Sequence, residues 1–207
     1  LQPSVLTGGY HHAALTGDVA QLKALLGREP AAAGARDVCG ATALHAAVFA
    51  AEEEAVDELL RAAEGMGAPP LLEATDLAGL RPLYVAVLCL AQPPPQSSGG
   101  AAEEAVGGSR ELKRQRIVRR LLAAGAEAGG GASDGDLDPP LLLAIGAGLP
   151  SLAAALLSEG ADPRACGVGA DAIPALHLAC RLGQLSVVEA LLEAGVGAMT
   201  IYQPSKL

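Results

Sequence analysis

A short phrase that recurs along the chain constrains its fold more than any other feature. It reads Pro-Ala-Leu-His-Leu-Ala-Cys at residues 174–180, and related phrases stand at 42–47, 82–86 and 140–144, with a degenerate copy at 10–14. In four copies a closing leucine follows the opening position by 15 residues: Tyr10 to Leu25, Leu44 to Leu59, Leu141 to Leu156 and Leu176 to Leu191. Spacing this regular indicates an internal repeat.

Each copy predicts two short helices. In the last copy Leu176, Ala179 and Cys180 fall on one side of a helix of period 3.6, and the apolar residues of 187–192 do the same in the next segment. A glycine follows each segment, at a position where glycine commonly ends a helix. One such pair cannot bury both apolar faces alone, so it needs neighbours of the same kind. We therefore expect the opening leucines to be buried between helices: Leu44, Leu83, Leu141 and Leu176.

The phrase, the spacing and a Gly-Ala terminator together resemble the ankyrin repeat family, from about Tyr10 to Val196. The resemblance implies an all-α solenoid of about five helix-turn-helix units joined by short β-turn or hairpin connectors, with the first and last units as caps. Residues 37–40 and 76–79 match the D-x-x-G turn that precedes an ankyrin helix. The copies are imperfect, since the third has Tyr84 and the fourth has Leu142 in place of the histidine.

The repeat also predicts the domain boundaries. We expect an N-terminal extension over 1–9, a repeat domain over 10–198 and a tail over 199–207. The five units are expected at about 10–36, 37–75, 76–133, 134–166 and 167–198. The third unit carries a segment near 92–109 that is rich in Pro, Gly and Ser, and this composition predicts a mobile loop. A second flexible connector is expected at Gly129–Gly131.

The composition and the net charge limit the possible functions and the cellular compartment of the chain. The chain has 207 residues, a net charge of −9 and no run of eighteen apolar residues, so neither general nucleic-acid binding nor a membrane span is expected. It has no Asn, and its four cysteines form no CxxC pair, which favours an intracellular, reducing setting such as the cytoplasm, with the nucleus left open. The start has neither a Met nor the features of a signal peptide, so a fragment is expected.

Four histidines raise the question of metal binding or catalysis. His11, His45 and His177 occupy equivalent places in three units, and equivalent places in a solenoid cannot converge on one ion. The resemblance implies that each ring bonds the backbone of an adjacent turn. We expect His12 to be partly exposed and Cys180 to lie in the core. Neither a nucleophilic triad nor a phosphate-binding loop is visible, so no enzyme activity and no cofactor are expected.

Residues 110–120 concentrate positive charge in one helix of an acidic chain. The simplest interpretation is a solvated outer helix. The functional interpretation is a basic patch for an acidic protein or a phosphorylated segment. Its residues would be Arg110, Lys113, Arg114, Arg116, Arg119 and Arg120.

The resemblance implies protein–protein recognition, as a scaffold or adaptor that binds through turn tips and inner helices. Apolar residues stand where ankyrin-like units face solvent, and we expect one contiguous patch, unless the connector after Leu60 or the long loop covers it. The expected patch comprises Val38, Val48, Phe49, Leu77, Leu80 and Leu88. The alternative function is the substrate-recruiting region of a larger enzyme, such as a ubiquitin-ligase receptor.

Overall fold

The computed structural model describes residues 3–65, 71–92, 102–129, 137–168 and 172–195, and only the backbone of 3–7, 64–65 and 102–109. This described part contains ten α-helices, one short 3₁₀ helix and no strand. A single antiparallel bridge joins Cys166 to Pro174. The all-α prediction is therefore confirmed for the described residues.

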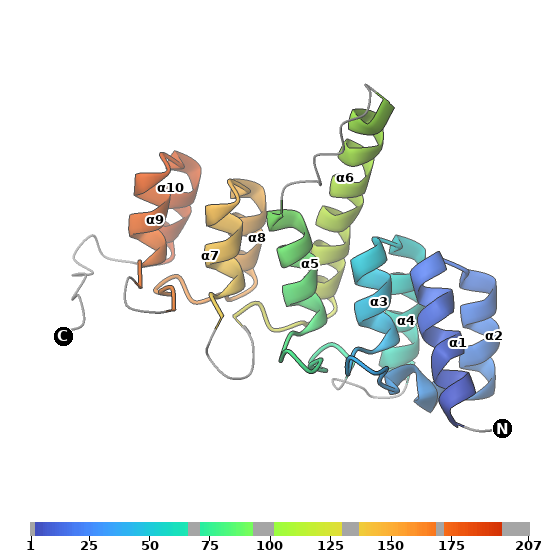
Figure 1. Ribbon diagram of the computed structural model, residues 1–207. Coiled ribbons are helices and arrows are strands. Elements are labelled where there is room, and N and C mark those ends of the chain that lie inside the picture. The colour runs from blue at the N-terminus through green and yellow to red at the C-terminus, as the bar shows by residue number, and fades with distance from the viewer. Residues whose placement is uncertain (1–2, 66–70, 93–101, 130–136, 169–171, 196–207) are drawn as a thin grey trace.

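The helices form five consecutive pairs, and the second helix of each pair runs back along the first (Figure 1). The 3₁₀ helix, Pro30–Gly34, lies between the first two pairs. The pairs are α1 (Pro3–Thr16) with α2 (Val19–Arg28), α3 (Ala43–Ala50) with α4 (Glu53–Gly65), α5 (Pro82–Ala91) with α6 (Ala102–Ala123), α7 (Pro140–Gly146) with α8 (Pro150–Ser158), and α9 (Ala175–Arg181) with α10 (Leu185–Glu193).

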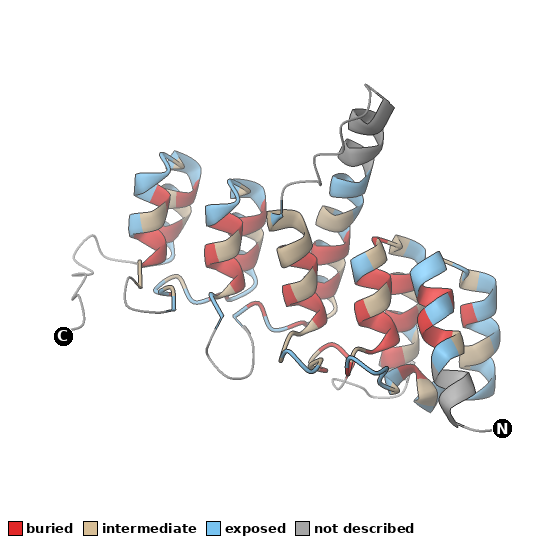
Figure 2. Cartoon of the chain, in the orientation of Figure 1, coloured by how far each residue is buried: buried red, intermediate tan, exposed pale blue. Residues whose placement is uncertain are grey.

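The pairs stand side by side in chain order (Figure 1). Each first helix contacts the first helix of the next pair, from α1 through α3, α5 and α7 to α9. Each second helix likewise contacts the next second helix, from α2 through α4, α6 and α8 to α10. The molecule is thus two parallel layers of helices with the apolar core between and within them (Figure 2).

The core is built from leucines and small residues. The four opening leucines, Leu44, Leu83, Leu141 and Leu176, are all buried, as the sequence predicts. Three residues after each opening position stands a fully buried alanine: Ala13, Ala47, Ala86, Ala144 and Ala179. A methyl group at this place lets neighbouring helices approach closely, so the chain fills its core with only 2% aromatic residues.

Two turns precede α3 and α5. The Asp37 carboxylate accepts hydrogen bonds from the amides of Cys39 and Ala41, at 2.8 and 2.9 Å, and Asp76 caps the second turn in the same way. Gly40 has a positive φ of 74°, and a Cβ there would lie 2.9 Å from the backbone nitrogen of Leu77. Glycine is therefore required both by the backbone and by the neighbouring turn. Both predicted turns are present.

Several boundaries differ from the predictions. α1 begins at Pro3, so residues 3–9 are helical and not an extension. α6 begins at Ala102, so the predicted loop near 92–109 is wrong for residues 102–109. Ala and Glu at 102–105 are strong helix formers and continue into the basic helix, which projects beyond its neighbours (Figure 1). Residues 93–101, 130–131 and 199–207 lie outside the described part of the chain.

Although α6 has 22 residues, none of the helices described is both long and apolar enough to span a bilayer.

Candidate partner-binding surface

Two turn tips carry exposed apolar side chains. Val38 is 93% exposed and Leu77 is 79% exposed. The Leu77 amide donates a hydrogen bond of 2.9 Å to the Cys39 carbonyl, which joins the two tips. We call Val38 and Leu77 the tip cluster. Because the backbone of both turns is fixed by the Asp37 and Asp76 carboxylates, these side chains are held outward on a rigid support.

A second row of positions lies along the first helices. Five residues after the opening leucine of α3, α5, α7 and α9 stand Phe49, Leu88, Gly146 and Arg181, which we call the helix row. Phe49 is 62% exposed, Leu88 is half-buried, and Gly146 and Arg181 are exposed. Since α3 contacts α5, α5 contacts α7 and α7 contacts α9, equivalent positions on these helices are neighbours.

The predicted apolar patch needs one correction. Val48 is only 1% exposed, so the prediction that it faces solvent is wrong. A helix turns by about 100° per residue, so Val48 points into the core while Phe49 points out. Leu80 and Leu88 are half-buried. What remains exposed is the tip cluster and Phe49, which the connector after Leu60 does not cover in the described part of the chain.

The histidines have structural roles in the first two pairs. His11 Nε2 lies 2.8 Å from the Ala41 carbonyl. In His45, Nδ1 accepts a 3.1 Å hydrogen bond from the Thr42 amide, so Nε2 carries the proton and donates to the Leu80 carbonyl at 3.0 Å. Burial lowers the pKa of His45, and its ring is neutral at pH 7. The predicted bonding to an adjacent turn is confirmed for these two residues.

The last pair differs from the others. His177 and Cys180 are exposed, so the predictions of a backbone-bonded His177 and a core Cys180 are wrong. The equivalent residues of α7, Leu142 and Ile145, are buried because α9 packs against them. In the part of the chain that the structure describes, no helix follows to cover α9 in the same way. His12 is exposed as expected, and Cys39 is also exposed.

The basic run on α6 is partly neutralised by α4. Arg116 lies 3.3 Å from the Glu53 carboxylate, and Arg120 pairs with both Glu53, at 3.4 Å, and Asp57. Arg114 donates to the Cys89 carbonyl at 2.9 Å. Arg116 and Arg120 therefore tie the third helix pair to the second, whereas Arg114 ties α6 to α5 within the third pair.

The other basic residues of the run stay available. Arg110, Lys113 and Arg119 are exposed and have no ion-pair partner among the described residues. Of the six predicted patch residues, half therefore remain free for a partner. The helix is not simply solvated, since Ile117 and Leu121 on its other side are buried.

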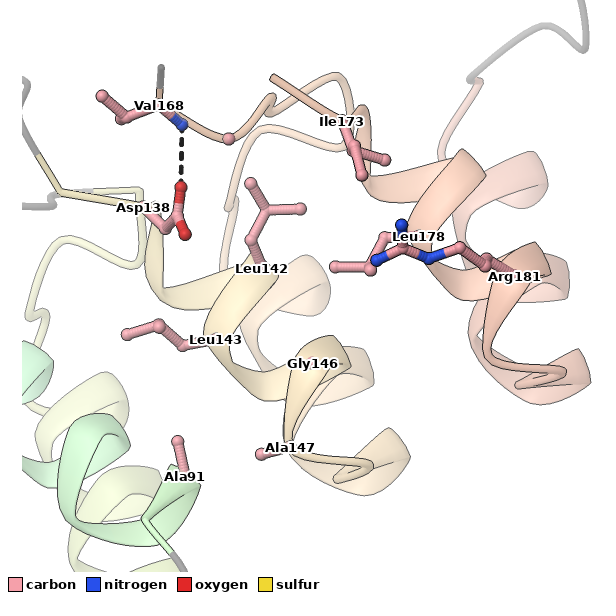
Figure 3. Close-up of a pocket in the computed structure, with 11 residues that line it drawn as sticks. Ala91, Asp138, Leu142, Leu143, Gly146, Ala147, Val168, Ile173, Leu178 and Arg181 are labelled. Carbon is pink, nitrogen blue, oxygen red and sulfur yellow. Dashed lines mark hydrogen bonds between the residues drawn. The ribbon is translucent and has the colours of Figure 1, made fainter. Parts of the chain in front are cut away.

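A groove follows α7 between α5 and α9 (Figure 3). Its volume is about 390 Å³, and its apolar floor includes Leu142, Leu143 and Leu178. Arg181 lies at one end of the groove and Asp138 at the other, where an Asp138 oxygen accepts a 2.8 Å hydrogen bond from the Val168 amide. Sequence reasoning missed this groove, although the glycine at 146 in a row of larger side chains was a signal for it.

The described residues contain no cluster of three or more His, Cys, Asp or Glu side chains that could hold a metal ion. What the surface presents instead is exposed apolar side chains on rigid turns, an apolar groove and unpaired cations. Such an arrangement supports non-covalent recognition.

The stacked helix pairs place the molecule among helical repeat proteins. The profile of the ankyrin repeat family matches residues 174–201, which include α9 and α10. No curated protein matches the chain. The suspected ankyrin resemblance is therefore confirmed for this segment. Ankyrin repeats are typically non-catalytic binding modules, so the match supports a role in protein interaction in general.

Proposed function

We propose that the five helix pairs are ankyrin-like units of one repeat domain that acts as a scaffold or adaptor, without enzyme activity of its own. The units carry the same apolar and alanine positions, and four of the five share the spacing of the matched last unit. Since each unit contacts only its neighbours, the domain offers a long, rigid surface to a partner protein. The four free cysteines suit an intracellular, reducing setting.

One observation carries the location of the binding surface. Val38, Phe49 and Leu77 are exposed apolar residues of two neighbouring units, and they stand on rigid turns and on an inner helix. Exposed apolar clusters mark interaction sites, and aromatic residues are enriched at their centres. Phe49 is the single Phe of the chain. The proposed partner therefore contacts the tip cluster and Phe49 together.

A double variant, Phe49→Asp with Leu77→Asp, tests this surface. Both side chains are exposed, so helix content and melting temperature should stay unchanged. The variant should capture at least about tenfold less of the proteins that the unchanged chain captures from the native source, as quantified by mass spectrometry. The matched control is Leu185→Asp, because Leu185 is 76% exposed but lies on α10, away from the tips.

Capture by the double variant at the unchanged level would contradict the proposed surface. Unfolding of the double variant would also contradict it, because the two side chains would then contribute to the core. The free cations Arg110, Lys113 and Arg119 provide a second contact for an acidic or phosphorylated segment. Their contribution predicts that capture weakens as the salt concentration rises.

A further inference from the structure

The groove along α7 has a specific structural cause. The helix row carries Phe49, Leu88 and Arg181 on three inner helices, but Gly146 on α7. A Cβ built at Gly146 would meet no atom within 4 Å, and its φ is not positive. The groove therefore lies where the row lacks a side chain. A side chain supplied by another molecule can occupy the same space.

The floor of the groove defines what that side chain must be. Leu142 and Leu143 of α7 and Leu178 of α9 line it, and Ile173 closes one side (Figure 3). A volume of about 390 Å³ lies in the range of ligand-binding sites, about 300–1,000 Å³. Covering these side chains removes apolar surface from water, which favours an apolar occupant.

Two opposite charges flank this floor. Arg181 is exposed and has neither a hydrogen-bond nor an ion-pair partner among the described residues. Asp138 is exposed at the other end and receives one hydrogen bond, from the Val168 amide. Asp138 stands just before α7 and Arg181 is the last residue of α9, so the two charges belong to neighbouring helix pairs.

We infer that the groove binds an extended segment of a partner protein that places an apolar side chain over Gly146, an acidic residue beside Arg181 and a basic residue toward Asp138. The charges of such a segment are complementary to those at both ends of the groove. The groove is open along its length, because Gly146, Ala147, Asp138 and Arg181 are all exposed, which suits a passing chain. This inference rests on the proposed role in protein recognition and assigns the partner's sequence pattern.

A phage-displayed library of random dodecapeptides, selected on the full chain, tests the inference. Selected peptides should share an apolar residue with an acidic residue on one side and a basic residue on the other. Gly146→Leu fills the groove with a side chain like that of Leu88. It should lower the affinity for the selected peptides, made synthetically, at least about tenfold, as measured by fluorescence anisotropy. Leucine is a better helix former than glycine and meets no clash here, so the variant should remain folded.

Matched variants separate the groove from other effects. Gly27→Leu is the control, because Gly27 is an exposed glycine of α2 with no atom near its Cβ. It should bind the peptides as the unchanged chain does. Arg181→Glu should lower the affinity for the peptides at least about fivefold. Exchanging the peptide's acidic residue for Lys should restore binding to this variant.

Three outcomes would overturn the inference. The first is that the selected peptides share no pattern, and the second is that they bind Gly146→Leu as tightly as the unchanged chain. The third is that the chain forms a dimer that Gly146→Leu disrupts, since a second copy would then occupy the groove. The proposed function is tested separately, by the Phe49→Asp/Leu77→Asp variant. If the Phe49→Asp/Leu77→Asp variant keeps its protein partners but Gly146→Leu loses its peptides, the tip surface is wrong and the groove is right.

Discussion

At the scale of single residues, Ala51 shows how the chain departs from its own pattern. Among the described residues it is the non-glycine residue with a left-handed backbone, at φ 64° and ψ 38°, where α3 ends. The equivalent positions of three other pairs hold Gly17, Gly148 and Gly183, with φ between 67° and 72°. The left-handed conformation costs an alanine about 1–2 kcal/mol, because its Cβ crowds the following carbonyl.

Ala51→Gly should therefore raise the free energy of unfolding by about 1 kcal/mol, after allowance for the greater freedom of glycine in the unfolded chain. The measurement is urea denaturation followed by circular dichroism. The reverse change, Gly148→Ala, is the matched control, since a Cβ there meets no atom within 4 Å and only the backbone is strained. It should lower the free energy of unfolding by a similar amount. A destabilised Ala51→Gly would refute the assignment of strain.

His45 makes stability depend on pH. Burial lowers its pKa below the value of 6.5 that it has when unfolded. As the pH falls below about 6.5, the unfolded chain binds a proton that the folded chain does not, so stability is present above this pH and is lost below it. Urea denaturation at about pH 7.5 and pH 5.5 should show a smaller loss for His45→Gln than for the unchanged chain. Equal losses would show that His45 does not contribute.

At the scale of helices, α6 divides its charges between two roles. Arg116 and Arg120 pair with Glu53 and Asp57 across 63 residues of sequence, whereas Arg110, Lys113 and Arg119 face solvent. The two groups lie on one helix, but only the first touches α4. A single basic run therefore both joins two helix pairs and leaves cations free for a partner.

This division predicts different effects of charge reversal. Arg116→Glu with Arg120→Glu should lower the free energy of unfolding by about 1 kcal/mol, because each exposed pair contributes up to about 1 kcal/mol and is screened by solvent. Reversal of Arg110, Lys113 and Arg119 to Glu should leave it within about 0.5 kcal/mol, because no intramolecular pair is lost. Thermal melts of both variants provide the measurement. Equal destabilisation by the two sets would mean that the free cations have partners in solution.

At the scale of the whole molecule, the stability of a repeat array is a sum of units and of the interfaces between neighbours. Tyr84, Leu142 and Ile145 are buried by the next pair, but His177, Cys180 and Leu192 of the last pair are exposed. Among the described residues, the last pair thus has one packed interface where the inner pairs have two. The free energy of local opening should therefore be lower for the last pair than for the inner pairs.

Hydrogen exchange measures this difference directly. Amides of α9 and α10 should exchange faster than those of α3, α5 and α7, at a pH where exchange follows local opening. Leu191→Ala should increase exchange within the last pair and leave α3 unaffected, because Leu191 is buried within that pair. Uniform exchange along the array would indicate that the whole domain opens as one cooperative unit.

The sequence by itself determined the helix pairs, apart from the N-terminal parts of α1 and α6, together with the opening leucines and the two Asp-capped turns. These follow from local spacing, since a helix of period 3.6 places residues on a face whatever surrounds it. The same reasoning correctly put Val38, Phe49 and Leu77 at the surface. It erred by one residue at Val48, because a step of about 100° around a helix separates core from solvent.

Only the tertiary structure decided the features that depend on neighbours. Whether His177 and Cys180 are buried depends on whether another helix pair covers α9, and their phrase resembles that of the buried copy at 42–47. The partners of Arg116 and Arg120 lie 63 residues away, so composition showed the charge but not its neutralisation. The groove at Gly146 exists because α5 and α9 stand on either side of α7. Packing between repeats, and not the repeat itself, determines which of these positions can meet a partner.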